Sequence, residues 1–198
     1  MQKSAIISPD GRYRYRLTRQ EPGAKHKVLW LMLNPSTADA EKDDPTIRKC
    51  LGFTQRLGFE AMMVWNLAAI RATDPKDVWA AMRRGEDIFG PDNLRHLSEM
   101  VQEASVVIAA WGAHGDRFHG GYIGHVDGIL WGAGRQTYNL GRCANGQPRH
   151  PLMVGYNNGL LQMAVPPREF GRAPLEPQTW MVEQLMGKMA KIREEEKP

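Results

Sequence analysis

The sequence predicts a three-layer α/β/α domain, with a central and mainly parallel β-sheet between two layers of helices. Two observations predict this class: short apolar runs that end abruptly at turn residues, and amphipathic stretches of helical length between those runs. Such alternation is typical of a parallel sheet with helices on both faces. A chain of 198 residues fits one domain with a substantial core. We find no repeat or linker that divides residues 1–198.

The N-terminal segment, about residues 5–19, predicts a basic β-hairpin. Ala5–Ser8 and Arg12–Leu17 flank a Pro9-Asp10-Gly11 turn. Period-two alternation predicts one polar face and one apolar face for the second strand. The polar face is formed by Arg12, Arg14 and Arg16, and the apolar face by Tyr13, Tyr15 and Leu17.

The positive charge of the chain is concentrated in this segment. Residues 1–27 contain seven Lys or Arg and two acidic residues, a balance of +5, whereas the whole chain carries +4. A row of arginines can hold phosphates and gives salt-dependent affinity for nucleic acid. We therefore expect Arg12, Arg14 and Arg16 to contact a nucleic-acid backbone. The alternative is a solvated edge strand whose charges discourage aggregation.

The first buried strand is Val28–Leu33, which stops at Asn34-Pro35-Ser36-Thr37. Asp44 is a good N-cap for a helix that starts at Pro45 and continues to Leu57, and Gly58 closes that helix. The remaining elements follow the same alternation. Further strands are expected at 61–67, 104–110 and 137–140, and further helices at 76–83, 93–103, 122–131 and, C-terminally, about 178–195.

Polar residues follow three of the predicted strands, at Asn34, Asn66 and Trp111-Gly112. The carboxyl ends of parallel strands share one edge of a sheet, where α/β folds bind ligands. We therefore expect these residues to line one crevice. Local roles are the alternatives: Asn34 forms a turn, Asn66 caps the start of the next segment, Asp44 caps a helix, and Trp111 packs as core or pocket wall.

Several classes of protein are excluded or disfavoured. Two cysteines, Cys50 and Cys143, favour a reducing cytoplasm, and we see neither a signal peptide nor a membrane span. The absence of GxxxxGK[ST] and GxGxxG patterns excludes P-loop nucleotide hydrolysis. We expect no cofactor and no metal, because the spacing of the candidate ligands matches no zinc pattern. Those candidates are His114, His119, His125, Asp116 and Asp127.

A set of short motifs is shared with a known family. They are Leu33–Asp39, Asp44–Arg48, Asn66-Leu67, Arg71–Pro75, Gly90–Asn93, Trp111-Gly112 and Arg149–Leu152. On these motifs the chain is identified as a member of the bacterial and phage family called domain of unknown function 1643. The resemblance covers roughly residues 5–163 and implies no particular activity.

A second resemblance is to the uracil-DNA glycosylase superfamily. Leu33–Ser36 resembles the Gly-x-Asn-Pro-Gly strand end of the mismatch-specific branch, whose Asn positions the attacking water. Val64–Asn66 resembles the strand end whose Asn pairs with a pyrimidine edge, and Trp111-Gly112 is similar to a later strand end. His150–Leu152 resembles a His-Pro-Ser loop that enters the minor groove and supports the leaving base. Ser36 replaces the Gly of that branch, and Leu152 replaces the polar residue of the loop.

This resemblance implies a glycosylase-like fold and recognition of a nucleobase in DNA, with excision of a damaged or modified base as the activity. Asn34 would orient the water, Asp39 (or Asp43 or Asp44) would serve as base, and His150 would stabilise the leaving group. The substrate-binding residues would be Pro35, Ser36, Thr37, Asp44, Asn66, Arg71, Trp111, Gly112 and Pro151. Two alternatives remain: an enzyme for free modified nucleotides or nucleosides, and a non-catalytic module that binds DNA or bases.

Overall fold

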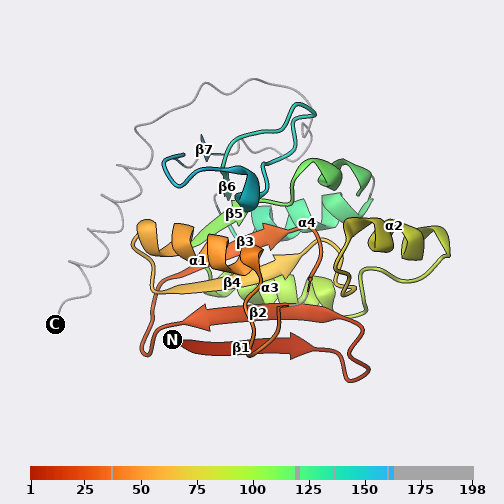
Figure 1. The fold of residues 1–198 in the computed structure, drawn as a ribbon, viewed down its shortest axis with the longest axis horizontal. Helices are drawn as coiled ribbons and strands as arrows, with labels where there is room; N and C mark the ends of the chain where they lie inside the picture. The colour runs from red at the N-terminus through yellow and green to blue at the C-terminus, as the bar shows by residue number, and fades with distance from the viewer. Residues whose placement is uncertain (37, 119–120, 136, 160, 163–198) are drawn as a thin grey trace.

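The structure, a computed structural model, describes residues 1–36, 38–118, 121–135, 137–159 and 161–162. A seven-stranded sheet with the order β1-β2-β4-β3-β5-β6-β7 crosses the molecule (Figure 1). The four central strands are parallel, namely β3 (Lys27–Met32), β4 (Ala61–Asn66), β5 (Val106–Ala109) and β6 (Thr137–Asn139). Antiparallel strands extend both sides, namely β1 (Gln2–Ile7), β2 (Arg14–Gln20) and β7 (Leu161–Gln162).

Helices cover both faces of the sheet, which confirms the predicted α/β class with a mainly parallel centre. One core forms where α1 (Pro45–Arg56) packs over Trp30 and Met62. The other core forms over Leu31 and Trp65, beneath three helices (Figure 1). These are α2 (Pro75–Arg83), α3 (Asn93–Glu103) and α4 (Gly121–Gly132).

The ends of the helices follow local sequence signals. Asp44 Oδ1 accepts a hydrogen bond from the Ile47 amide at 2.8 Å, so Asp44 is the N-cap of α1, as predicted. Gly58, with φ of 78°, follows the C-terminus of α1. Two short 3₁₀ helices, η1 (Ala113–Arg117) and η2 (Pro151–Met153), were not predicted. The helix expected over about 178–195 lies outside the described residues.

The hairpin forms, but its arginines do not share one face. In the pairing of β1 with β2, Ile6 lies opposite Arg16 and Ile7 lies opposite Arg14, so Tyr15 is an extra residue. Such a β-bulge interrupts the alternation of side chains. Arg14 therefore points to the α1 side of the sheet and Arg16 to the α3 side. The prediction of a single row of Arg12, Arg14 and Arg16 is wrong for this reason.

The second hairpin strand is also not an edge strand, contrary to the alternative prediction. β2 pairs with β1 on one side and with β4 on the other. Arg12 pairs with Glu86 at 2.6 Å, and Arg16 makes two bonds to Glu103 at 2.5 and 2.7 Å. Much of the basic charge of the hairpin is thus paired with carboxylates of the same chain.

Arg19 binds the loop that leads to α1. It is fully buried, with Nε 2.7 Å from Asp43 Oδ1 and a terminal nitrogen 2.6 Å from the Asp39 carbonyl oxygen. Both cysteines are free. Within the described ranges, no helix combines the length and the apolarity that a bilayer crossing requires.

Candidate functional site

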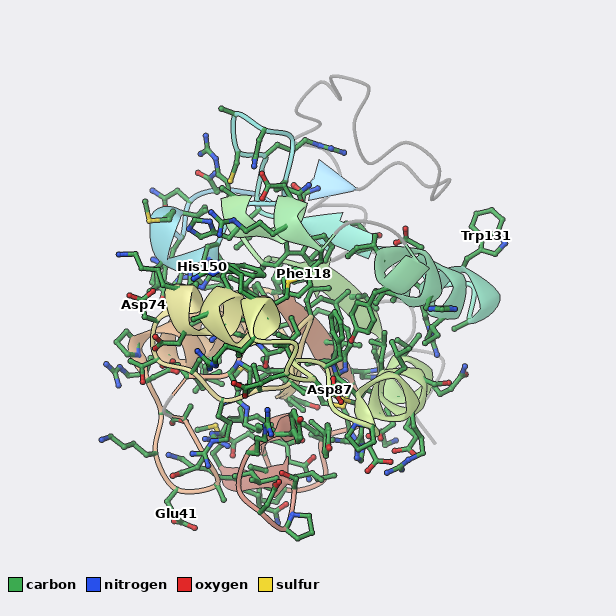
Figure 2. The ribbon with its side chains drawn as sticks, turned by 90° about the vertical axis from the view of Figure 1, so that its right-hand side faces the viewer. Glu41, Asp74, Asp87, Phe118, Trp131 and His150 are labelled. Atoms are coloured by element: carbon green, nitrogen blue, oxygen red, sulfur yellow. The ribbon has the colours of Figure 1, made fainter. Side chains whose placement is uncertain are left out.

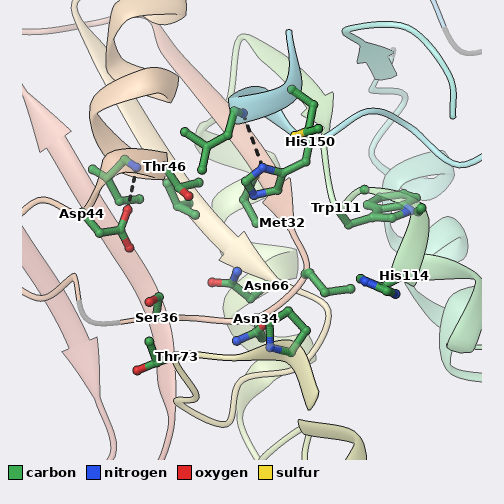
Figure 3. Close-up of a pocket in the computed structure, with 18 of the residues that line it drawn as sticks. Met32, Asn34, Ser36, Asp44, Thr46, Asn66, Thr73, Trp111, His114 and His150 are labelled. Carbon is green, nitrogen blue, oxygen red and sulfur yellow. Dashed lines mark hydrogen bonds between the residues drawn. The ribbon is translucent and has the colours of Figure 1, made fainter. Parts of the chain in front are cut away.

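A cavity of about 480 Å³ opens at the carboxyl ends of the parallel strands (Figure 3). Numbered along the chain, these strands lie in the order second, first, third, fourth. The connection from β3 leads to β4 on one side, and the connection from β4 leads to β5 on the other side of β3. This reversal creates a topological switch point at the carboxyl end of β3. Ligands bind at such points in open α/β sheets, and the volume is within the range of ligand pockets.

The three polar strand ends meet at this cavity. Asn34 follows β3, Asn66 ends β4, and Trp111-Gly112 follows β5. Other walls come from β2, the first turn of α1, the segment before α2, and η2. The complete lining is Arg14, Met32, Leu33, Asn34, Ser36, Asp44, Thr46, Ile47, Val64, Asn66, Thr73, Pro75, Trp111, Gly112, Ala113, His114, His150, Leu152 and Met153.

Asn34 joins two loops at the mouth of the cavity. Its Nδ2 donates to the Ala72 carbonyl at 2.7 Å and to the Pro35 carbonyl at 3.3 Å, and the Ala72 amide donates back to the Pro35 carbonyl at 2.9 Å. This arrangement differs from the predicted turn, in which the side-chain oxygen would accept from a nearby amide. Because the nitrogen is used on the loops, the oxygen is the atom of this amide that remains for a ligand or a water.

Asn66 is held by an arginine beneath it. Asn66 is buried, and its Oδ1 accepts from a terminal nitrogen of Arg14 at 3.1 Å. The other terminal nitrogen of Arg14 donates to the Ala38 carbonyl at 2.7 Å. Burial lowers the pKa of Arg14 to about 10, although the nearby Asp44 carboxylate opposes the shift, so Arg14 stays charged at neutral pH. No side-chain cap by Asn66 occurs among the described contacts.

Asp44 has two structural roles. One carboxylate oxygen caps α1 through Ile47, and the side chain also lines the cavity (Figure 3). It is the only carboxylate in the lining formed by the described residues. The helix cap and the placement of a negative charge at the cavity are therefore both functions of this one side chain.

His150 is the N-cap residue of η2, and its side chain points into the cavity (Figure 3). Its Nδ1 accepts from the Leu152 amide at 3.4 Å, so the proton of the neutral ring lies on Nε2. Burial lowers the pKa of His150 below the ordinary 6.5. The ring is consequently neutral at pH 7, with an N–H donor available to the cavity. Figure 2 shows His150 on the side of the molecule that carries Asp74, away from the projecting Trp131.

The loop that carries His150 is fixed to the end of β5. The Gly112 amide donates to the Pro148 carbonyl at 2.9 Å, and Trp111 Nε1 donates to Gln147 Oε1 at 2.7 Å. Gly112 has φ of 80°, and a Cβ at this position would lie 3.3 Å from His150 Cβ. Only glycine meets both conditions without strain. Trp111 is buried and forms a wall of the cavity.

Several predicted site residues lie elsewhere. Asp39 accepts from the Lys42 and Glu41 amides at 2.8 Å each, which lowers its pKa, and it does not line the cavity. Arg71 is exposed and donates to the Gly11 carbonyl at 3.2 Å. Pro35 and Pro151 are buried and lie outside the lining of the cavity. The exposed Arg12 and the partly buried Arg16 also lie outside the lining. Thr37 lies outside the described residues.

Other lining residues were not predicted as part of the site. Thr46 follows the predicted cap and Thr73 lies in the family motif, so both had a local signal. The sequence predicts that Arg14 contacts a nucleic-acid backbone, but the β-bulge directs it to the cavity. Leu152 and Met153 lie at the rim with exposed fractions of 47% and 77%. The sequence points to His114 only as a candidate metal ligand, whereas the structure places it in the lining of the cavity.

No cluster of three or more potential metal ligands occurs in the part of the chain that the structure describes. His114 lies at the cavity, His125 and Asp127 belong to α4, and His119 is outside the described residues. The polar groups of the lining are amides, hydroxyls, the two imidazoles of His114 and His150, the guanidinium of Arg14 and the carboxylate of Asp44.

The fold and the cavity define an α/β protein with a polar-lined cavity at the switch point of its sheet. The chain belongs to the family described as protein of unknown function (DUF1643), which it matches over residues 14–152. The matched region contains every described lining residue except Met153. No curated protein and no solved structure matches the chain.

Proposed function

We propose that this protein binds a nucleobase in the switch-point cavity and hydrolyses its N-glycosidic bond, in the manner of the uracil-DNA glycosylases. One observation carries the proposal. A fixed amide (Asn66), a neutral imidazole (His150) and a carboxylate (Asp44), from three separate segments, line the same cavity (Figure 3).

The composition of the cavity supports a flat heteroaromatic ligand. Met32, Val64 and Trp111 provide apolar surface for the faces of a base. Asn66 and the hydroxyl groups of Ser36 and Thr46 provide hydrogen bonds for its edge. Pockets that bind small molecules commonly combine apolar walls with a few polar groups in this way.

The chemistry requires a water, a negative charge and support for the leaving base. Asn34 Oδ1 can orient a water toward the anomeric carbon, and Asp44 can stabilise the cationic sugar and take the proton of that water. The carbon–nitrogen bond breaks with its electron pair on the base, and the water oxygen forms the new bond to the sugar. In this proposal Asp44 takes the role that the sequence assigned first to Asp39.

His150 can stabilise the departing base. A neutral imidazole with its proton on Nε2 donates to an oxygen on which negative charge develops, and it does so without prior rearrangement. The segments that resemble the glycosylases, around Asn34, Asn66 and His150, are the ones that line the cavity. That coincidence supports a glycosylase-like activity.

Free nucleosides are the second candidate substrates, because the arginines of the hairpin are engaged. Arg12, Arg16 and Arg19 bind carboxylates of the same chain instead of forming an open basic row. Exposed Leu152 and Met153 at the rim favour DNA, since apolar side chains of this kind insert between bases that are being unstacked.

DNA binding is tested by the fluorescence anisotropy of labelled single-stranded and double-stranded oligonucleotides, measured across a salt series. Hydrolysis is tested by chromatography of the released bases. We expect binding that weakens with salt and with the pair Leu152→Ser/Met153→Ser. The control is Met82→Ser, which changes an apolar residue on α2 that is as exposed as Leu152.

For hydrolysis, we expect Asp44→Asn and Asn34→Ala to reduce base release by about 100-fold or more while binding persists. Release of the base from free nucleosides but not from DNA would identify nucleosides as the substrates. Binding without release in any substrate contradicts the hydrolase and leaves a binding module. If neither oligonucleotides nor nucleosides bind, the proposed function is wrong.

A further inference from the structure

We propose that Arg14 fixes the Asn66 amide in one orientation, so that the cavity selects bases that present a carbonyl oxygen there over bases that present an amino group. This inference rests on the proposed function and names the class of base. Its basis is the contact between a buried arginine and a buried asparagine, both in the lining of the cavity.

The chemistry of arginine determines which end of the amide faces it. A guanidinium group has only donors, so the atom that contacts it at 3.1 Å must be the Asn66 oxygen. The amide nitrogen is then directed to the cavity, as Figure 3 shows. A reversed amide would set donor against donor in a buried place, which reduces its population by roughly tenfold or more.

Arg14 cannot easily move away to permit that reversal. Its exposed fraction is 3%, and its second terminal nitrogen is bound to the Ala38 carbonyl at 2.7 Å. Its Nε has no hydrogen-bond partner among the described residues, so the arginine is already short of acceptors. Releasing the Asn66 oxygen would leave a further donor of the same buried cation unpaired.

Asn66 is held from the backbone side as well. Asn93 Nδ2 donates to the Asn66 carbonyl at 3.0 Å, and this fixes the end of β4. The hydroxyls of Ser36, Thr46 and Thr73 can each donate or accept, so they do not discriminate between oxo and amino groups. The Asn66 amide nitrogen and His150 Nε2 are both donors, and together they suit a ligand that presents acceptors.

The experiment compares matched ligands in equilibrium binding. Uridine is paired with cytidine and inosine with adenosine, and the same pairs of bases are placed centrally in otherwise identical single-stranded oligonucleotides. We expect the wild-type protein to prefer the oxo member of each pair by about tenfold or more, since a donor that faces an amino group stays unpaired.

Three variants isolate the role of Arg14. Arg14→Met removes the fixing donors, and we expect the preference to fall toward equal binding. Asn66→Asp keeps the partner of Arg14 but presents only acceptors, so the preference should reverse to the amino member. Arg12→Met is the matched control, because Arg12 binds Glu86 outside the cavity, and it should keep the wild-type ratio.

The outcomes separate this inference from the proposed function. Equal binding of oxo and amino ligands by the wild type, or an unchanged preference in Asn66→Asp, overturns the role of Arg14 and Asn66 while base recognition stands. A complete lack of binding by all nucleosides and oligonucleotides overturns both. Asn66→Asp keeps the test decisive even if Arg14→Met fails to fold.

Discussion

Arg14 donates to Asn66 Oδ1 at 3.1 Å, across the boundary between the N-terminal hairpin and the first pair of parallel strands. The two residues are 52 positions apart in the sequence. This contact links the basic hairpin to the polar strand ends, two features that appear unrelated in the sequence. The arginine acts from inside the protein, on the orientation of a cavity residue.

The two roles of Asp44 can be separated by two substitutions. Asp44→Ala removes the cap of α1 and should lower the free energy of unfolding by about 1 kcal/mol. Asp44→Asn keeps an acceptor for the Ile47 amide but removes the charge, so stability should be nearly unchanged. Denaturant unfolding checks both values. Equal losses of stability in the two variants would show that the charge, not the cap, is what stabilises the fold.

Gly112→Ala should disturb the site as well as the backbone. The alanine would have to adopt φ of 80° with ψ of 179°, a region that is essentially restricted to glycine, and its Cβ would lie 3.3 Å from His150 Cβ. We expect a loss of about 1–2 kcal/mol in unfolding free energy from the conformation alone, together with shifted NMR signals of His150. Gly11→Ala is the control, since Gly11 also has positive φ but open space around it. It should cost stability without moving the His150 signals.

Breaking the pair of Arg19 and Asp43 should be strongly destabilising. Arg19 is fully buried, and Arg19→Met leaves Asp43 with Lys3 as its remaining cationic partner. We expect a loss of about 3–5 kcal/mol, as for other buried pairs that lose one partner. Thermal unfolding measures this, and Lys3→Met serves as the more exposed comparison. A small effect of Arg19→Met would mean that the loop 39–43 is held by other contacts.

His150 should titrate below pH 6.5 and occupy a defined tautomer. Burial lowers its pKa, so the folded state binds fewer protons than the unfolded chain in this window. Its contribution to stability is therefore present above about pH 6.5 and falls as the pH drops toward the folded pKa. Nitrogen-15 NMR, assigned with His150→Gln, should show the proton on Nε2 at pH 7. A proton on Nδ1 would contradict the proposed role of His150.

The elements of the central sheet could be predicted because each carries its own local signal. Val28–Leu33 is a continuous apolar run, and Asp44-Pro45 marks a helix start whatever surrounds it. The position of Asn34 and Asn66 at one edge follows from the parallel arrangement alone. These inferences need only neighbouring residues and the rules of strand order.

The position of Arg14 could not be predicted in this way. A β-bulge depends on how two strands align, and nothing in Arg12–Leu17 marks Tyr15 as the extra residue. The same limit applies to Asp39, since its bonds to Glu41 and Lys42 arise from a loop conformation. Side chains whose direction depends on a loop or a bulge require the structure.

The residues that line the cavity come from almost the whole length of the described chain, from Arg14 to Met153. A ligand that fits it therefore binds the folded protein and has no preformed site in the unfolded one. Such a ligand raises the unfolding free energy by about 2.7 kcal/mol at a concentration one hundred times its dissociation constant. The melting temperature thus reports occupancy without any assumption about chemistry, and a collection of nucleosides, bases and short oligonucleotides can be ranked by heating alone.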